Sequence, residues 1–78
     1  MEIMRLCDVE NLKCCVLSEI RGLEIAKHKR LVELGFVQGT KIEILKNSRK
    51  AKTMVIGIRG YTISIDYLLA ENIFVWGK

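Results

Sequence analysis

The chain has 78 residues, of which 13 are Lys or Arg and 9 are Asp or Glu, and its formal net charge is +4. A chain of this size forms one small domain and has no room for a substrate cleft between two lobes. Half of its residues are hydrophobic and 28% are charged, a composition typical of globular proteins and not of disordered ones. We therefore expect residues 1–78 to fold as a single domain.

The N-terminal stretch and the cysteines indicate the compartment. No part of the sequence approaches the roughly 18 uninterrupted apolar residues that a transmembrane helix requires. Glu2, Arg5 and Asp8 stand where a signal peptide would have its apolar core. The cysteine count is odd and Cys14 and Cys15 are adjacent, which favours reduced thiols over a disulfide framework. These features predict a cytoplasmic protein.

The first half of the chain is predicted to contain one strand and one helix. Alternating side chains predict a strand over residues 12–20, and Arg21-Gly22 interrupts the pattern. Residues 23–34 contain no Gly or Pro and are rich in helix-forming residues, so they are predicted to form a helix. Gly35 is expected to end this helix in the left-handed conformation that costs Gly little.

The predicted helix has apolar residues on two sides. Ile25 and Val32 fall together on one side, next to His28 and Lys29. Either the chain covers the helix on both sides, or this second pair forms an apolar patch left for a partner. The opposite side carries the stripe that we expect to face the core: Leu23, Ala26, Leu31 and Leu34.

The second half of the chain is predicted to be mostly strand. Residues 40–46 and 54–58 alternate between apolar and other residues, and residues 46–52 are polar and basic. We interpret the latter as a hairpin loop in which Asn47 and Ser48 are turn formers.

A tight reversal at Arg59-Gly60 leads into the next predicted strand, residues 61–66. Its alternation places Tyr61 on the same face as the apolar residues, so we expect Tyr61 on the core face. A single helical turn and a last strand complete the chain, residues 67–71 and 72–76.

The order of these elements predicts a mainly β fold with one α-helix inserted between the first and second strands. An open sheet of five short strands would expose long edges, and the chain has no proline to protect them. Closure into a small barrel removes the edges, with the helix at one open end. The predicted fold is therefore a small SH3-like five-stranded barrel.

Catalytic constellations are not recognisable in the sequence. The only histidine, His28, lies within a basic run, and no serine has a nucleophile-elbow motif or a base at motif spacing. Glycine-rich nucleotide-binding motifs and the C-x-x-C spacing of zinc sites do not occur. The sequence leaves open whether Cys15 faces solvent or is half-buried, and a thiol with no recognisable histidine partner is a weak candidate nucleophile. We expect no enzymatic activity, no catalytic residues and no cofactor.

Basic residues are clustered in two places. Residues 44–65 contain no acidic residue at all, and the helix carries a second group next to His28. Either cluster has the charge to meet phosphates, anionic lipid or an acidic protein surface, or else is simply a solvated surface. The basic residues of the acid-free stretch are Lys46, Arg49, Lys50, Lys52 and Arg59.

Two sequence blocks carry a resemblance to a known family. Residues 30–45 contain Arg-Leu-x-x-Leu-Gly, then an apolar residue, then Gly-Thr and an alternating strand. Residues 58–61 read Ile-Arg-Gly-Tyr and lead through Ala70 into a final apolar strand. Both blocks resemble the FeoA family, the small cytoplasmic proteins of bacterial ferrous iron uptake. The loop at residues 47–51 departs from that pattern, because it is basic and lacks the proline that many relatives carry there.

The resemblance implies a non-enzymatic adaptor that binds the cytoplasmic region of FeoB, the membrane transporter for ferrous iron, with at most peripheral contact with the membrane. Self-association is an open alternative. The residues expected to bind the partner lie on the second side of the helix and in the basic loop: Ile25, His28, Lys29, Val32, Lys46, Arg49, Lys50 and Lys52.

Two other functions compete with this interpretation. Small basic barrels bind nucleic acids, although the only aromatic residue near the basic loop is Tyr61, so we expect no nucleic-acid partner. The FeoA-like module is also appended to metal-dependent repressors of the DtxR type, so a metal-responsive role is the other alternative. Its candidate ligands are Cys7, Asp8, Cys15 and His28, and we expect at most weak divalent metal binding.

Overall fold

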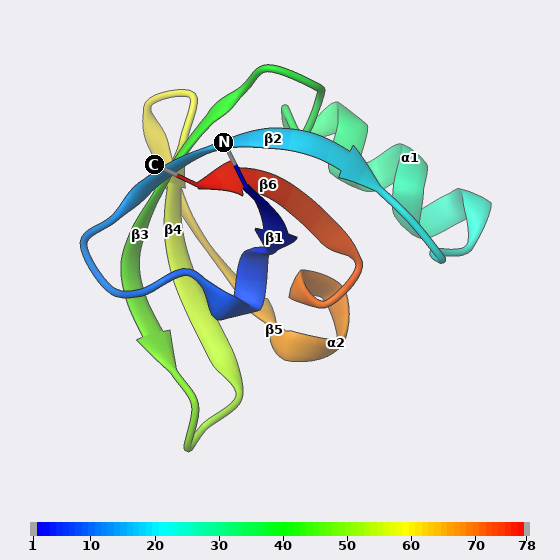
Figure 1. Ribbon diagram of the computed structural model, residues 1–78. Coiled ribbons are helices and arrows are strands. Elements are labelled where there is room, and N and C mark those ends of the chain that lie inside the picture. The colour runs from blue at the N-terminus through cyan, green and yellow to red at the C-terminus, as the bar shows by residue number, and fades with distance from the viewer. Residues whose placement is uncertain (1, 78) are drawn as a thin grey trace.

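The computed structural model describes residues 2–77, and over this range it is mainly β, as predicted (Figure 1). The single long helix lies between the first and second predicted strands, which are β2 and β3 of the structure. The described elements are, in chain order, β1 (Ile3–Arg5), the 3-10 helix η1 (Leu6–Asp8), β2 (Cys14–Ile20), α1 (Ile25–Glu33), β3 (Lys41–Ser48), β4 (Thr53–Ile58), β5 (Tyr61–Asp66), α2 (Tyr67–Ala70) and β6 (Ile73–Gly77).

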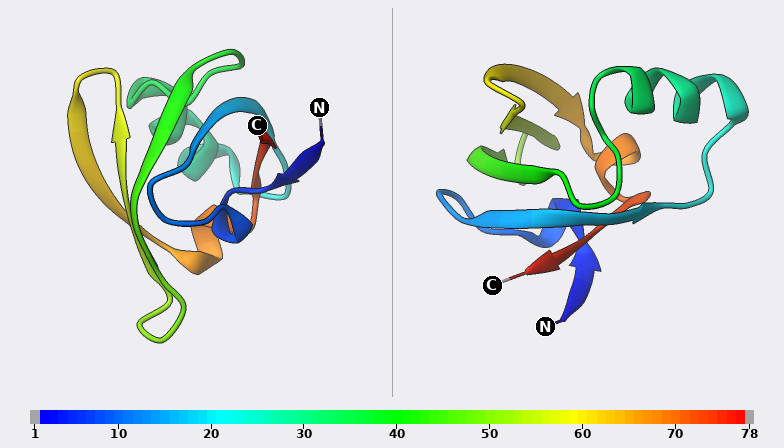
Figure 2. Two further views of the ribbon diagram at one scale, coloured as in Figure 1. Left: turned by 60° about the vertical axis from the view of Figure 1, so that its left-hand side comes forward. Right: turned by 90° about the horizontal axis from the view of Figure 1, so that it is seen from above.

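The short strand β1 adds a sixth strand to the five predicted. All the strands form one sheet in the order β1-β6-β2-β3-β4-β5, and every neighbouring pair is antiparallel. Figures 1 and 2 show that this sheet curls strongly around its interior. The pairings within residues 2–77 run from β1 to β5 without joining these two strands, so the structure does not confirm closure into a complete barrel.

Apolar side chains of the curled sheet form the core. The alternation of β4 is confirmed, because Met54, Ile56 and Ile58 are all buried. Ile42 and Ile44 are buried likewise on β3, which then shifts register between Ile44 and Lys46. This bulge lets the strand bend, as expected where one strand has an extra residue.

The first long strand has its buried face at Cys15 and Leu17. Cys15 does not face solvent, the possibility that the sequence left open: it is 0% exposed, and burial raises the pKa of the thiol to about 12. A thiol held neutral in this way is a poor nucleophile. Cys15 is therefore a core residue.

Asn47 lies inside β3 and is not a turn former, since the strand continues to Ser48. Its side-chain amide donates hydrogen bonds to the carbonyl oxygens of Cys7 at 2.9 Å and Val9 at 2.8 Å. The hydroxyl of Tyr67 donates to the Asn47 side-chain oxygen. One half-buried asparagine thus joins η1, β3 and α2.

The two ends of the described chain lie side by side. β1 pairs with β6, and the Gly77 N–H donates a hydrogen bond to the Glu2 carbonyl oxygen at 3.1 Å. Figure 1 shows the N and C labels next to each other on one side of the sheet.

Within residues 2–77, neither helix has the length and apolar character needed to cross a membrane.

Candidate functional site

Helix α1 is the most exposed element of the structure. Leu31 is its only buried residue, and Leu23 and Leu34, which flank the helix, are half-buried against the core. Ala26 was expected in the core stripe but is exposed, because the first turns of α1 stand away from the sheet (Figure 2). The core thus holds this helix mainly near its C-terminal end.

The second apolar pair on α1 is not covered by the described chain. Ile25 is 88% exposed and Val32 is 43% exposed. His28 and Lys29 are exposed between them, so the four predicted helix residues share one open side. The sequence left open whether the chain covers this second side of the helix or leaves it as an apolar patch. In the structure the side is open.

The C-terminal end of α1 has the geometry of a Schellman motif. The Phe36 N–H donates to the Leu31 carbonyl at 2.9 Å, and the Gly35 N–H donates to the Val32 carbonyl at 3.0 Å. Gly35 has a φ of +105°, as predicted for the residue that ends the helix. Leu31 and Phe36 are both buried, which gives the motif its usual apolar contact. The motif Leu-x-x-Leu-Gly-Phe therefore builds the helix end.

The turn between β4 and β5 packs against this end of α1. Arg59 and Gly60 both have positive φ and form a two-residue turn of type I′ between paired Ile58 and Tyr61. A Cβ placed on Gly35 would lie 2.3 Å from Cδ of Arg59, so the arginine side chain lies directly on this glycine.

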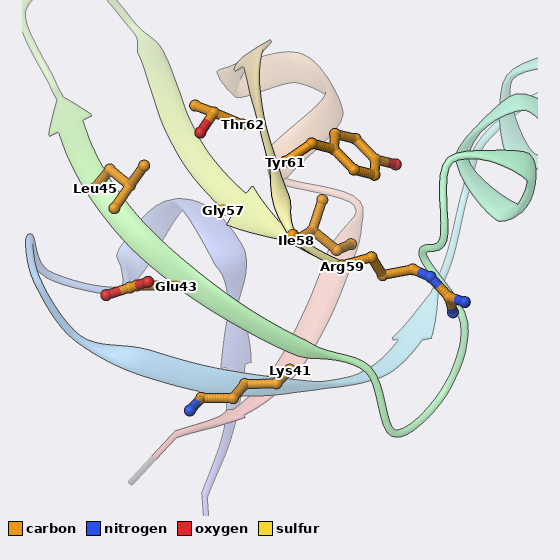
Figure 3. Close-up of a pocket in the computed structure, with 9 residues that line it drawn as sticks. Lys41, Glu43, Leu45, Gly57, Ile58, Arg59, Tyr61 and Thr62 are labelled. Carbon is orange, nitrogen blue, oxygen red and sulfur yellow. The ribbon is translucent and has the colours of Figure 1, made fainter.

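Tyr61 completes this attachment. Its hydroxyl donates a hydrogen bond to the Leu34 carbonyl oxygen, one of the carbonyls left without a partner at the end of α1. As expected, Tyr61 shares its strand face with Ile63 and Ile65, which belong to or pack against the core, but it lies at the rim of that face and is 40% exposed. Figure 3 shows Tyr61 and Arg59 pointing toward the chain around the end of α1, beside a shallow hollow of about 380 Å³.

The predicted hairpin residues form a second group, separate from the helix. Lys46, Arg49, Lys50 and Lys52 are all exposed along β3 and the turn that follows it. Figures 1 and 2 show this hairpin extending away from the body, with α1 on another side of the molecule. The eight predicted partner-binding residues therefore form two separate surfaces. The four helix residues lie on one side of α1, and the four basic residues lie on the hairpin.

The candidate metal ligands do not converge. Within the described residues, no group of three or more His, Cys, Asp or Glu side chains is placed to hold a metal ion. Cys7 and Cys15 are buried, and burial raises the pKa of both thiols, which disfavours the thiolate that binds metal. Asp8 forms an ion pair with Arg5 at 3.3 Å, and His28 lies on α1. This donor set does not fit a resident metal.

A model of the FeoA domain matches residues 4–76. The chain belongs to the FeoA family. The match contains the helix-ending motif, the β4–β5 turn and the last strand, so it extends over nearly all of the elements described above. The family is associated with ferrous iron transport. No curated protein sequence matches the chain.

Solved structures have the same fold. An iron uptake regulatory protein, FeoA, has a TM-score of 0.85 at 18% identity, with 100% of each chain covered. A zinc complex of FeoA from Stenotrophomonas maltophilia, described as a prokaryotic SH3-domain protein, has a TM-score of 0.81 at 20% identity, over 92% of this chain and 88% of that one. These similarities confirm the SH3-like fold class.

The fold also occurs inside a larger protein. A manganese-dependent transcriptional repressor has a TM-score of 0.90 at 14% identity, over 100% of this chain but 38% of the repressor. The FeoA chain thus spans well under half the length of that neighbour. Because identity is this low, the similarity shows the fold alone.

Sequence reasoning missed the attachment of the helix end. The sequence correctly predicts a turn at Arg59 and places Tyr61 on the core face, but it does not show that both residues lie against residues 34–35. The sequence does indicate a tight turn at Arg59-Gly60, which folds Tyr61 back beside the preceding strand. Nothing in the local pattern, however, shows which distant segment such a turn contacts.

Proposed function

We propose that this FeoA chain is a single-domain, non-enzymatic adaptor of the cytoplasm that binds the cytoplasmic region of a FeoB-type ferrous iron transporter. The observation that supports this best is the open side of α1, with Ile25 88% exposed beside Val32. Adjacent exposed aliphatic side chains on a helix that the core hardly covers are typical of a docking surface for another protein.

The structure of α1 suits this role physically. Its C-terminal end is fixed by the Schellman motif and by Tyr61, so the helix presents its side chains in a defined orientation. A preorganised surface loses less conformational entropy on binding than a flexible one. His28 and Lys29 supply polar contacts next to the aliphatic pair.

The basic hairpin adds long-range attraction to this contact. The β3–β4 hairpin, which carries Lys46, Arg49, Lys50 and Lys52, extends from the body, where these charges attract an acidic partner surface or the anionic lipid around the transporter (Figure 1). Such charges raise the association rate more than the affinity, and their effect declines with salt.

The test is pull-down and titration calorimetry with the cytoplasmic region of the FeoB encoded in the same genome. The double variant Ile25→Asp, Val32→Asp is expected to bind at least about tenfold more weakly, because two carboxylates would have to be desolvated at the contact.

The matched control is the double variant Leu12→Asp, Leu45→Asp. These two leucines are 78% and 38% exposed, close to the exposures of Ile25 and Val32, but neither belongs to α1. The control should bind like the unmodified chain. Equal binding by both double variants would reject this side of α1, and no binding by the unmodified chain would reject the transporter as partner.

A further inference from the structure

Strand β5 is a free edge of the sheet. It is the last strand in the order and pairs with β4 on one side only. Its sequence, Tyr-Thr-Ile-Ser-Ile-Asp, has none of the lysines or prolines that commonly protect an edge, and its one charge is at the end. The opposite edge, β1, has only three residues, which limits its pairing.

The backbone groups that β5 directs outward follow from its pairing. Tyr67 N–H donates to the Lys52 carbonyl at 2.9 Å, and a two-residue turn joins Ile58 to Tyr61. In an antiparallel pair, residues alternate between bonding to the neighbour and facing away from it. Residues 61, 63 and 65 therefore bond to β4, while Thr62 and Ser64 direct their N–H and C=O groups away from the sheet.

These outward groups are without recorded partners in residues 2–77. No backbone hydrogen bond of Thr62 or Ser64 outside the β4 pairing is found there, and both residues are exposed. An edge of this kind is the template on which a further strand adds.

A groove of about 730 Å³ runs along this edge, between β5 and α1. Four consecutive residues, 63–66, line it. Because successive residues of a strand point to opposite faces, a hollow lined by all four meets the strand at its edge. The right-hand view of Figure 2 shows α1 across from β5, with α2 between them.

Leucine side chains form the apolar part of the groove wall, which also carries charged and polar residues. Leu31 and Leu34 line it from the end of α1, and Leu68, which is 76% exposed, and Leu69 line it from α2. The Tyr61 hydroxyl joins β5 to the end of α1, next to Leu34. Residues 62–66 of the edge lie beyond this contact and suit an extended segment of about five residues, or roughly 16 Å.

One cation on the helix wall is not paired. Arg30 lines the groove and forms no ion pair among the residues described, whereas Lys27 beside it lies 3.7 Å from Glu24. Asp66 and Glu71 line the same groove from the β5–α2 side, so a fitting occupant has a carboxylate facing Arg30 and a cation facing these two carboxylates.

We propose that β5 and this groove take up an extended segment of a partner protein as an additional strand. Backbone groups of the segment bond to Thr62 and Ser64, its alternate apolar side chains pack against Leu31, Leu34 and Leu68, and an acidic residue pairs with Arg30. Helix residues on the opposite side, Ile25 and Val32, take no part, so this site is separate from the docking side proposed above.

The first experiment selects binders from a displayed library of short random peptides on the unmodified chain. The expected consensus alternates apolar with other residues and contains Glu or Asp. Leu68→Asp should weaken the selected peptide roughly tenfold or more, while the equally exposed Leu12→Asp should change its affinity less than about twofold. Failure to enrich any peptide that depends on Leu68 would overturn the proposal.

The second experiment tests backbone pairing with two versions of the selected peptide, methylated on alternate sets of amide nitrogens. A strand on β5 uses one set only, so one version should lose binding and the other should keep it. Equal tolerance of both sets would show a groove that binds side chains alone, and would reject strand addition.

Amide hydrogen exchange gives an independent readout. In the free chain, Thr62 and Ser64 should exchange quickly while Ile63 and Ile65 are protected, and the peptide should slow Thr62 and Ser64. If these two amides are instead protected without peptide in a concentration-dependent dimer, a second copy of the chain occupies the edge, and the proposal is wrong. The variant Ile25→Asp, Val32→Asp should bind the peptide normally, which separates this test from that of the transporter.

Discussion

The curled sheet and helix α1 are built on different principles, although both belong to a chain of 78 residues. In β4, every second residue is fully buried, and the strand lies between two neighbours. In α1, one residue of nine is buried, and the helix is held mainly by the Schellman motif and the Tyr61 hydrogen bond at its C-terminal end. The sheet supplies the stability of the domain, and the helix adds surface.

This difference indicates which positions of the chain tolerate substitution without loss of stability. Removing atoms from a packed core costs both transfer free energy and the cavity left behind, whereas an exposed helical position has neither term. An exposed helix kept in place by a few specific contacts is more easily explained by binding than by folding. The next three predictions test this contrast, from the largest expected effect to the smallest.

Ile56→Ala should lower the free energy of unfolding by about 2–5 kcal/mol, because Ile56 is fully buried in β4. The matched change on the helix, Ile25→Ala, should stay within about 0.5 kcal/mol of the unmodified chain. Urea denaturation followed by circular dichroism measures both. Comparable losses in the two variants would show that the open side of α1 is part of the folded core.

Gly35→Ala should cost about 1–3 kcal/mol, since alanine is strained at a φ of +105° and its Cβ would lie 2.3 Å from Cδ of Arg59. Gly39 provides the control: its φ is +91°, but nothing lies within 4 Å of a Cβ placed there. Gly39→Ala should therefore cost less. Adding Arg59→Ala to Gly35→Ala should recover the difference, and an unchanged cost would mean that Arg59 does not hold the helix end.

Tyr61→Phe should cost about 1 kcal/mol or less, because it removes one exposed hydrogen bond to Leu34. Its clearer effect should be local: amide exchange in the last turn of α1 should accelerate while exchange in β4 stays the same. Uniform acceleration throughout the domain would indicate that Tyr61 supports the whole fold and not the helix in particular.

The strands could be predicted where burial alternates locally. Met54, Ile56 and Ile58 alternate because one face of β4 is in the core, and that pattern is visible without any partner strand. β1 was missed because three residues are too short to show a period, and its partner β6 lies at the other end of the chain. Asn47 was misread for a related reason: its hydrogen bonds connect it to residues about 40 positions away.

The candidate site was predictable only in part. Ile25 and Val32 could be found on the helix by their spacing, because a core stripe on the other side left them unexplained. The β5 edge and its groove could not, since they depend on which strand ends the sheet and on how α1 crosses it. The full burial of Cys15 and the partial exposure of Tyr61 were likewise decided by packing between distant elements.

The contact between Glu2 and Gly77 has a consequence for how the module combines with others. A polypeptide whose beginning and end emerge together can be spliced into a loop of a host protein, or joined end to end and reopened elsewhere, at little cost in chain entropy. Because the two ends are adjacent, a linker attached at either end starts from nearly the same point on the domain. A fusion at the N-terminus and a fusion at the C-terminus would therefore hold the domain at similar distances from the host protein.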